Sequence, residues 1–169
     1  DTEIEELDDR RVRVRGTRFL PASKQTLKLE GARLRGYRTV AIAGMVDPAL
    51  ISNLDFVEAK VRETVADLAG DTVNPDAYKL RFVYYGRDGA AAPQPAAFSE
   101  TPPDVGVVLE AIAENQQTAN YLLSLARSSF LHRDFEGRKA TGGNLAFPFS
   151  PSDFPGGPVY EFNIYHLME

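Results

Sequence analysis

Residues 47–70, DPALISNLDFVEAKVRETVADLAG, restrict the fold most, because they form an amphipathic helix pattern between two β-forming segments. Asp47 can cap this helix with Pro48 in its first turn, or Ser52 can cap a later start, and Gly70 can end it. The apolar residues on one face are Leu50, Leu54, Val57, Val61 and Leu68. Such a face has to be buried against a sheet or another helix.

Further strand and helix patterns lie on both sides of this segment. Strands are expected at 36–44, 78–86, 105–113 and 159–167. A second helix can begin at Asn115 or Thr118, with one face formed by Ala119, Leu122, Leu123, Ala126 and Phe130. From residue 36 the order is strand, helix, strand, strand, helix, strand. This order predicts an α+β domain with the ferredoxin-like split βαβ arrangement, in which both helices cover one face of an antiparallel sheet.

The N-terminal residues alternate between apolar and polar side chains. Segments 10–16 (RRVRVRG) and 26–31 (TLKLEG) both show this strand pattern, and we expect them to pair as an extra β-hairpin. Residues 1–35 are therefore predicted to be an acidic segment and a hairpin that extends the domain. Residues 36–169 are predicted to form the ferredoxin-like domain itself.

Charge is distributed unevenly along the chain. The net charge is −5, with six acids in residues 1–9 and ten Arg or Lys residues between 10 and 38. A net acidic chain is poorly suited to binding nucleic acid, which requires a basic surface. A solvated hairpin face, or a contact with an acidic neighbour, explains the basic stretch better.

Several function classes are excluded or disfavoured by what the sequence lacks. The chain has no cysteine, no apolar run of about 20 residues, and an acidic start unlike a signal peptide. We therefore expect a cytoplasmic protein with no membrane partner, and the first residue, Asp1, is compatible with a truncated or processed chain. Phosphate-loop, dinucleotide and serine-nucleophile motifs are absent, so no cofactor is predicted. Two histidines are too few for a three-histidine metal site, and no metal is predicted.

The two histidines occupy different predicted elements. His132 lies at the end of the second helix, where it can cap the last carbonyls or transfer a proton. His166 lies in the last strand, where a position on the sheet surface or in an interface is favoured over a ligand role.

Residues 137–158, GRKATGGNLAFPFSPSDFPGGP, form the most unusual stretch of the sequence. Cations, hydroxyls and backbone N–H groups could bind a carboxylate or phosphate here. The candidate residues are Arg138, Lys139, Thr141, Gly142, Gly143, Asn144, Ser150, Ser152 and Asp153. Four apolar residues in the stretch disfavour a disordered tether. The sequence equally favours two interpretations of this stretch, a structural loop that covers the sheet and a loop that binds a ligand.

A second polar cluster ends the strand predicted at 78–86. Tyr84, Tyr85, Arg87 and Asp88 gather there, within reach of the long loop on a split βαβ fold.

The segments LKLEGARLRGYRTVAIAGMVDP, YKLRFVYYGRDGA, VGVVLEAIAENQQTANYLLSLARSSFLH and GRKATGGNLAFPFSPSDFPGGPVYEFNIYHLME resemble the second half of the AtuA family. These are the acyclic terpene utilisation proteins of bacterial catabolism. The resemblance implies a place in the degradation of citronellol- and geraniol-type compounds through acyl-CoA intermediates. Family members usually carry a further glycine-rich N-terminal α/β half. We expect that half to be lost, cleaved or supplied by a separate chain, and we expect an oligomer.

Two functional hypotheses follow from the resemblance. In the first, the chain is the C-terminal domain or subunit of a catabolic enzyme acting on an organic acid or acyl-CoA thioester. His132 or Asp153 would transfer protons, and the cations and glycines of the 137–158 loop would bind the carboxylate or phosphate. In the second, the chain is a non-catalytic assembly module that packs against the N-terminal half.

Overall fold

The computed structural model describes residues 1–87, 89–90, 104–139 and 144–168. The chain divides into two compact units. The larger unit is Arg33–Glu161, and the smaller unit is Asp1–Ala32 with Phe162–Glu169. Strands β3 (Leu27–Met45) and β6 (Asp153–Met168) run through both units.

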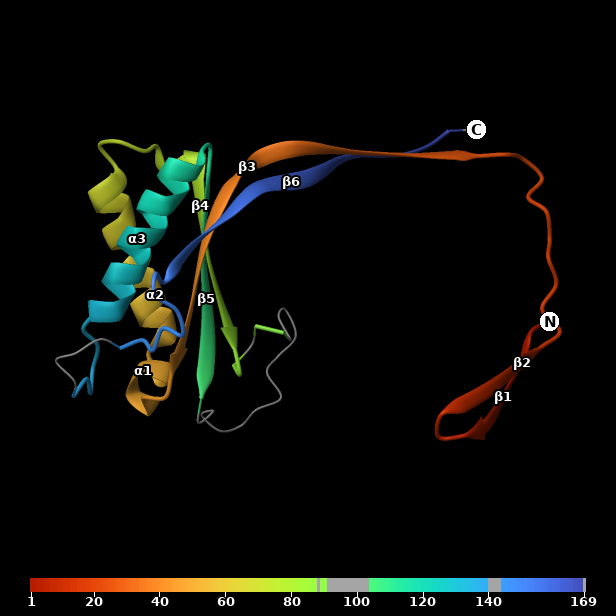
Figure 1. The fold of residues 1–169 in the computed structure, drawn as a ribbon, viewed down its shortest axis with the longest axis horizontal. Helices are drawn as coiled ribbons and strands as arrows, with labels where there is room; N and C mark the ends of the chain where they lie inside the picture. The colour runs from red at the N-terminus through yellow and green to blue at the C-terminus, as the bar shows by residue number, and fades with distance from the viewer. Residues whose placement is uncertain (88, 91–103, 140–143, 169) are drawn as a thin grey trace. The chain divides into compact units, whose positions relative to one another are not determined.

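The larger unit is a four-stranded sheet with its helices on one face. After β3 come α1 (Pro48–Ser52), α2 (Leu54–Ala69), the 3₁₀ turn η1 (Pro75–Ala77), β4 (Tyr78–Tyr85), β5 (Val105–Ala113), α3 (Gln116–His132) and β6. The strand order is β4-β5-β3-β6, and β5 is antiparallel to both β4 and β3. Figure 1 shows α1, α2 and α3 on the same side of β3, β4 and β5. The predicted α+β class is confirmed.

The core lies between this sheet and the helices. In β5 every second residue from Val105 to Ala113 is buried, as are the odd-numbered residues of β3 from Thr39 to Met45. The face predicted for the second helix is buried as a whole in α3. Because strand side chains alternate between faces, the even-numbered residues of β3 and β5 belong to the face opposite the helices.

The helix predicted at 47–70 is divided in two. Asp47 caps α1 by accepting a hydrogen bond from the backbone N–H of Ala49 at 2.9 Å. The chain then bends at Asn53, and α2 begins at Leu54, so Ser52 is not the cap. Leu68 is not part of the buried stripe, since it lines a groove beside α3 and is 58% exposed.

The hairpin pairs differently from the prediction. β2 (Arg11–Arg15) pairs with β1 (Glu3–Asp8), while residues 27–31 belong to β3. The observed register places Glu3 opposite Arg15 and Glu5 opposite Arg13. The acidic and basic stretches are therefore neighbouring strands, and opposite charges across a strand pair stabilise that register.

Candidate functional site

The described start of the 144–152 segment contacts the end of α3. Asn144 donates from its backbone N–H to the carbonyl of Leu131 at 2.9 Å, and its Nδ2 donates to the carbonyl of Arg133 at 3.0 Å. The last carbonyls of a helix have no partner within the helix. Asn144 therefore serves as a cap for α3 from a distant position in the sequence.

Arg138 contacts the same helix end. Its Nη1 donates to the carbonyl of His132 at 2.9 Å. Its backbone N–H donates to the carbonyl of Phe135, which follows the helix, at 3.2 Å. A cation at this end of a helix is favoured by the helix dipole. Lys139, its neighbour, is exposed.

His132 is the last residue of α3, and its side chain is exposed. It lines a groove of about 450 Å³ between α2 and α3, together with Thr64, Leu68, Leu125, Ser128, Ser129, Arg133 and Asp134. Arg133 donates from Nη2 to Ser129 at 3.1 Å and also to the hydroxyl of Thr64. The capping role expected of His132 is carried out by Asn144 and Arg138.

Asp153, the first residue of β6, forms an ion pair with Arg127 of α3. Its Oδ1 lies 2.7 Å from Nε of Arg127 and accepts a hydrogen bond from Ser152 Oγ at 2.9 Å. The Arg127 guanidinium also lies 6.0 Å from the centre of the Phe147 ring. These contacts join the start of β6 to α3, so Asp153 has structural partners of its own.

The next part of the described loop contacts β3 at Gly44. Gly44 and Ala146 exchange two backbone hydrogen bonds of 2.8 and 2.9 Å, and Leu145 is buried. Ser150 is exposed. The described residues of this loop make structural contacts, and the binding alternative stays a prediction. Thr141, Gly142 and Gly143 lie outside the described residues, as does Asp88.

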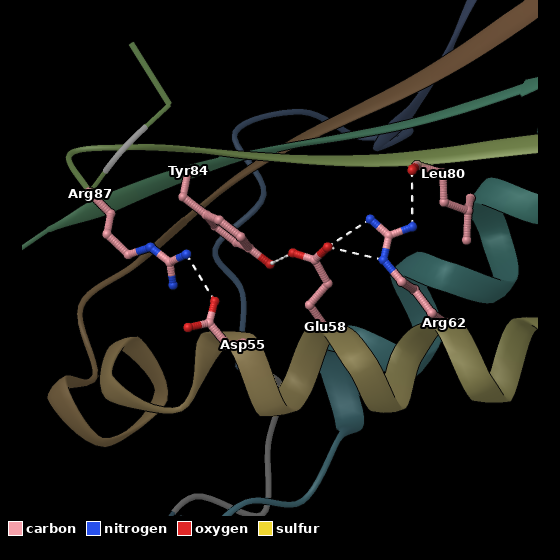
Figure 2. Close-up of polar contacts among 6 residues, drawn as sticks. All are labelled: Asp55, Glu58, Arg62, Leu80, Tyr84 and Arg87. Atoms are coloured by element: carbon pink, nitrogen blue, oxygen red, sulfur yellow. Dashed lines mark hydrogen bonds and ion pairs between the residues drawn. The ribbon is translucent and has the colours of Figure 1, made fainter. Parts of the chain in front are cut away.

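The tyrosine cluster predicted at the end of β4 contacts α2 (Figure 2). Tyr84 donates its hydroxyl to Glu58 Oε2 at 3.0 Å, and Arg62 donates to Glu58 Oε1 from Nη2 at 2.6 Å and from Nε at 3.0 Å. Arg62 also donates to the carbonyl of Leu80 at 3.0 Å. Burial raises the pKa of Tyr84 well above its usual value, and the nearby Glu58 carboxylate raises this pKa further. The cluster joins α2 to β4 through a buried hydroxyl.

The other members of that cluster lie nearer the surface. Arg87 donates from Nη2 to Asp55 Oδ1 at 2.9 Å, and its guanidinium lies 5.0 Å from the Tyr84 ring centre (Figure 2). Tyr85 is 52% exposed on the opposite face of the sheet. The cluster is thus divided between the two faces.

The face opposite the helices carries a polar group that we did not predict. Glu110 in β5 is 6% exposed and lies between Arg81 of β4 and Arg38 of β3. All three line a groove of about 760 Å³ in the larger unit. The available signal was a single acid within the apolar strand VGVVLEAIA.

Two negative findings apply to the described residues. None of the described helices is both long enough and apolar enough to cross a membrane. In the same part of the chain, no three His, Asp or Glu side chains are grouped so that they could hold a metal ion.

The comparisons with known proteins identify a protein family. The family model described as acyclic terpene utilisation family protein AtuA matches residues 1–148 of the 169-residue chain. Neither the curated proteins nor the solved structures provide a match. The matched region includes β1 to β5, all three helices and the start of the loop after α3. The chain therefore belongs to the AtuA family of acyclic terpene utilisation proteins.

Proposed function

We propose that this chain is an assembly domain of an AtuA-family protein that packs against a separate N-terminal AtuA-like half. The observation that carries the proposal is the smaller unit, in which no described residue is buried. Its exposed large apolar side chains are Ile4, Leu7, Val12, Val14, Phe19, Leu20, Leu27, Leu29, Phe162, Ile164, Tyr165, Leu167 and Met168. A surface this rich in apolar side chains is typical of an interaction site.

The hairpin supports this proposal. Ile4 lies opposite Val14, whereas the flanking pair Glu3 and Arg15 belongs to the other face. One face thus carries Ile4, Val12 and Val14 together with the acid Glu6, and the other face carries the ion-paired charges. An isolated two-stranded hairpin is at best marginally stable in water, so an apolar partner surface would supply the missing burial.

Three of the predicted catalytic and anion-binding residues have contacts that fit a non-catalytic role. Arg138 and Asn144 bind carbonyls at the end of α3, and Asp153 is paired with Arg127. These contacts give the residues a structural reason for their identity without a substrate.

We also infer that the larger unit has the ferredoxin-like split βαβ arrangement. The strand order β4-β5-β3-β6 supports this inference. So do the connections, since α1 and α2 connect β3 to β4 and α3 connects β5 to β6. In such folds the two helical connections place both helices on one face.

The test is to co-express the chain with an N-terminal AtuA-like half and to measure the complex mass by light scattering. We expect a stable complex that is weakened by Val14→Asp and by Phe162→Asp, since each replaces an exposed apolar side chain with a charge. Lys139→Asp in the larger unit is the control. Failure of the two halves to associate, or equal association of all variants, would refute the assembly role.

A catabolic role on an organic acid or acyl-CoA thioester is the second candidate. The position of His132 favours this candidate, because His132 lines a groove together with Arg133 and two serines. Thermal unfolding with carboxylates and CoA esters, in the presence of the N-terminal half, tests it. The candidate predicts a rise in melting temperature that His132→Asn and the double variant Arg138→Ala, Lys139→Ala reduce. The assembly proposal predicts that turnover of the complete protein survives both changes.

A further inference from the structure

Two arginines flank one carboxylate on the sheet face opposite the helices, and Lys79 lines the same groove. In the strand register Arg81 lies directly opposite Glu110, while Arg38 and Lys79 both lie opposite Ile112. Arg38 and Glu110 are even-numbered residues of paired strands, and Lys79 and Arg81 lie directly opposite even-numbered residues of β5. The side chains of all four therefore belong to the same face of the sheet.

Glu110 holds the two guanidinium groups in place. Its Oε2 lies 2.8 Å from Nη1 of Arg81, and its Oε1 lies 3.2 Å from Nη1 of Arg38. The Glu110 side chain is 7% exposed, whereas Arg38 and Arg81 are 39% and 52% exposed. Each guanidinium has five N–H donors, so donors remain on both after the contact with Glu110.

The two arginines are the groups that can bind an anion here. Four cations (Arg35, Arg38, Lys79 and Arg81) and four carboxylates (Asp76, Glu110, Glu114 and Glu161) line the groove, so its formal charge is zero, but Arg38 and Arg81 share the single carboxylate of Glu110. Glu161 is engaged elsewhere, because that carboxylate lies 3.2 Å from Arg35 and also contacts Arg33. A carboxylate suits paired arginines, since the planar guanidinium matches it geometrically.

The surrounding groove supplies apolar contacts. Its volume is about 760 Å³, and Leu34, Ile112 and Val159 are among its lining residues. This volume is within the range of small-molecule sites, roughly 300 to 1,000 Å³. Asp76 and Glu114 also line the groove, which disfavours a ligand with a second negative charge at its far end.

We propose that this groove binds a monocarboxylate that carries an apolar chain or ring. The carboxylate accepts hydrogen bonds from Arg38 and Arg81, and the apolar part contacts Leu34, Ile112 and Val159. Glu110 is a positioning residue that orients the guanidinium groups. The site lies in the larger unit and does not depend on the assembly role of the smaller one.

The experiment is a titration of the full 169-residue chain with octanoate, followed through backbone amide signals. We expect shifts centred on residues 110–112 and on the two arginines. Acetate lacks the apolar chain and octanol lacks the charge, so both should bind at least about tenfold more weakly.

Matched variants locate the charge contact. Arg81→Gln and Arg38→Gln should each weaken octanoate binding by about tenfold, because each removes a charge-assisted hydrogen bond. Arg81→Lys keeps the charge but loses the planar group, so it should give an intermediate loss of octanoate affinity. It also replaces Arg81→Gln in the experiment if that variant unfolds. Lys60→Gln is the control, because Lys60 lies on α2 and pairs with Glu63.

Three outcomes would overturn the proposal. The first is equal binding of octanol and octanoate, and the second is unchanged affinity in folded Arg38 and Arg81 variants. The third is movement of the same amide signals with protein concentration and not with octanoate, which would show that this face joins two copies of the chain.

Discussion

The two units use the same alternating strand pattern and bury very different fractions of it. In β5, Val107 and Leu109 are 0% and 1% exposed, because α2 and α3 cover that face of the sheet. In β2, Val12 and Val14 are 62% and 54% exposed. Alternation therefore determines which side chains share a face, but a neighbouring element determines whether that face is buried.

The difference also separates two sources of stability. The larger unit contains all the buried apolar side chains of the described chain, so its own core can stabilise it. The smaller unit has backbone pairing, surface ion pairs and a cation–π contact between Lys28 and Tyr165, but none of its described residues is buried. Its stability is expected to come from a partner surface, and the following measurements test that division.

The largest effect is expected from one aromatic substitution made in both units. Phe130→Ala removes a 0% exposed ring that lies 6.1 Å from the Phe82 ring, and should lower the free energy of unfolding by about 3 to 5 kcal/mol. Phe162→Ala removes a 76% exposed ring and should change it by less than about 0.5 kcal/mol. Urea unfolding followed by circular dichroism measures both. A comparable loss for Phe162→Ala would show that the smaller unit has a core of its own.

The second prediction concerns the buried hydroxyl of the larger unit. Tyr84→Phe leaves Glu58 Oε2 without its donor, and should cost about 1 to 2 kcal/mol in urea unfolding at neutral pH. Tyr85→Phe is the control, because Tyr85 is half exposed on the other face. Equal losses for the two variants would contradict a specific role for the Tyr84 contact.

The same residue predicts a dependence on alkaline pH. Its pKa is raised in the folded state above the ordinary value of 10.0, so the folded chain retains a proton that the unfolded chain releases. The stabilisation is complete below pH 10 and declines above it by about 1.4 kcal/mol per pH unit. Unfolding measured from pH 9 to 11 should therefore show a steeper decline for the native chain than for Tyr84→Phe.

Local signals in the sequence predicted the larger unit well. Asn115 caps α3 by accepting from the backbone N–H of Thr118 at 2.9 Å, and the helix face that follows is buried as expected. Such features depend on residues only a few positions apart. The order of strands and helices after residue 36 could be derived from them.

Contacts between distant residues could not be derived in this way. Asp153 pairs with Arg127, and Asn144 caps the helix that ends at His132, but nothing in the spacing identifies these partners. The sequence of the predicted anion-binding loop contains residue types suited to an anion, but it does not reveal which residues those side chains contact. The partner of β2 was missed for the same reason, since several strands could pair with it.

A smaller effect is expected from the cap supplied by the loop. Asn144→Ala removes the hydrogen bond to the carbonyl of Arg133 and should lower the free energy of unfolding by about 1 kcal/mol. Lys139→Ala, a change at an exposed position close in sequence, should have an effect within about 0.5 kcal/mol. Urea unfolding of both variants provides the measurement. If Lys139→Ala were the more damaging change, the described loop would owe its stability to the cation and not to the cap.

The smallest effect is expected from a charge in the hairpin. Glu5 contacts Arg13 at 3.1 Å and Arg15 at 3.8 Å, but its side chain is 55% exposed. Glu5→Gln should change the opening free energy of the hairpin amides by less than about 0.5 kcal/mol, because water and salt screen exposed ion pairs. Amide hydrogen exchange at low and high salt measures this, with Lys60→Gln on α2 as a matched surface change. A loss larger than that of Asn144→Ala would mean that surface charge, and not an apolar partner surface, stabilises the smaller unit.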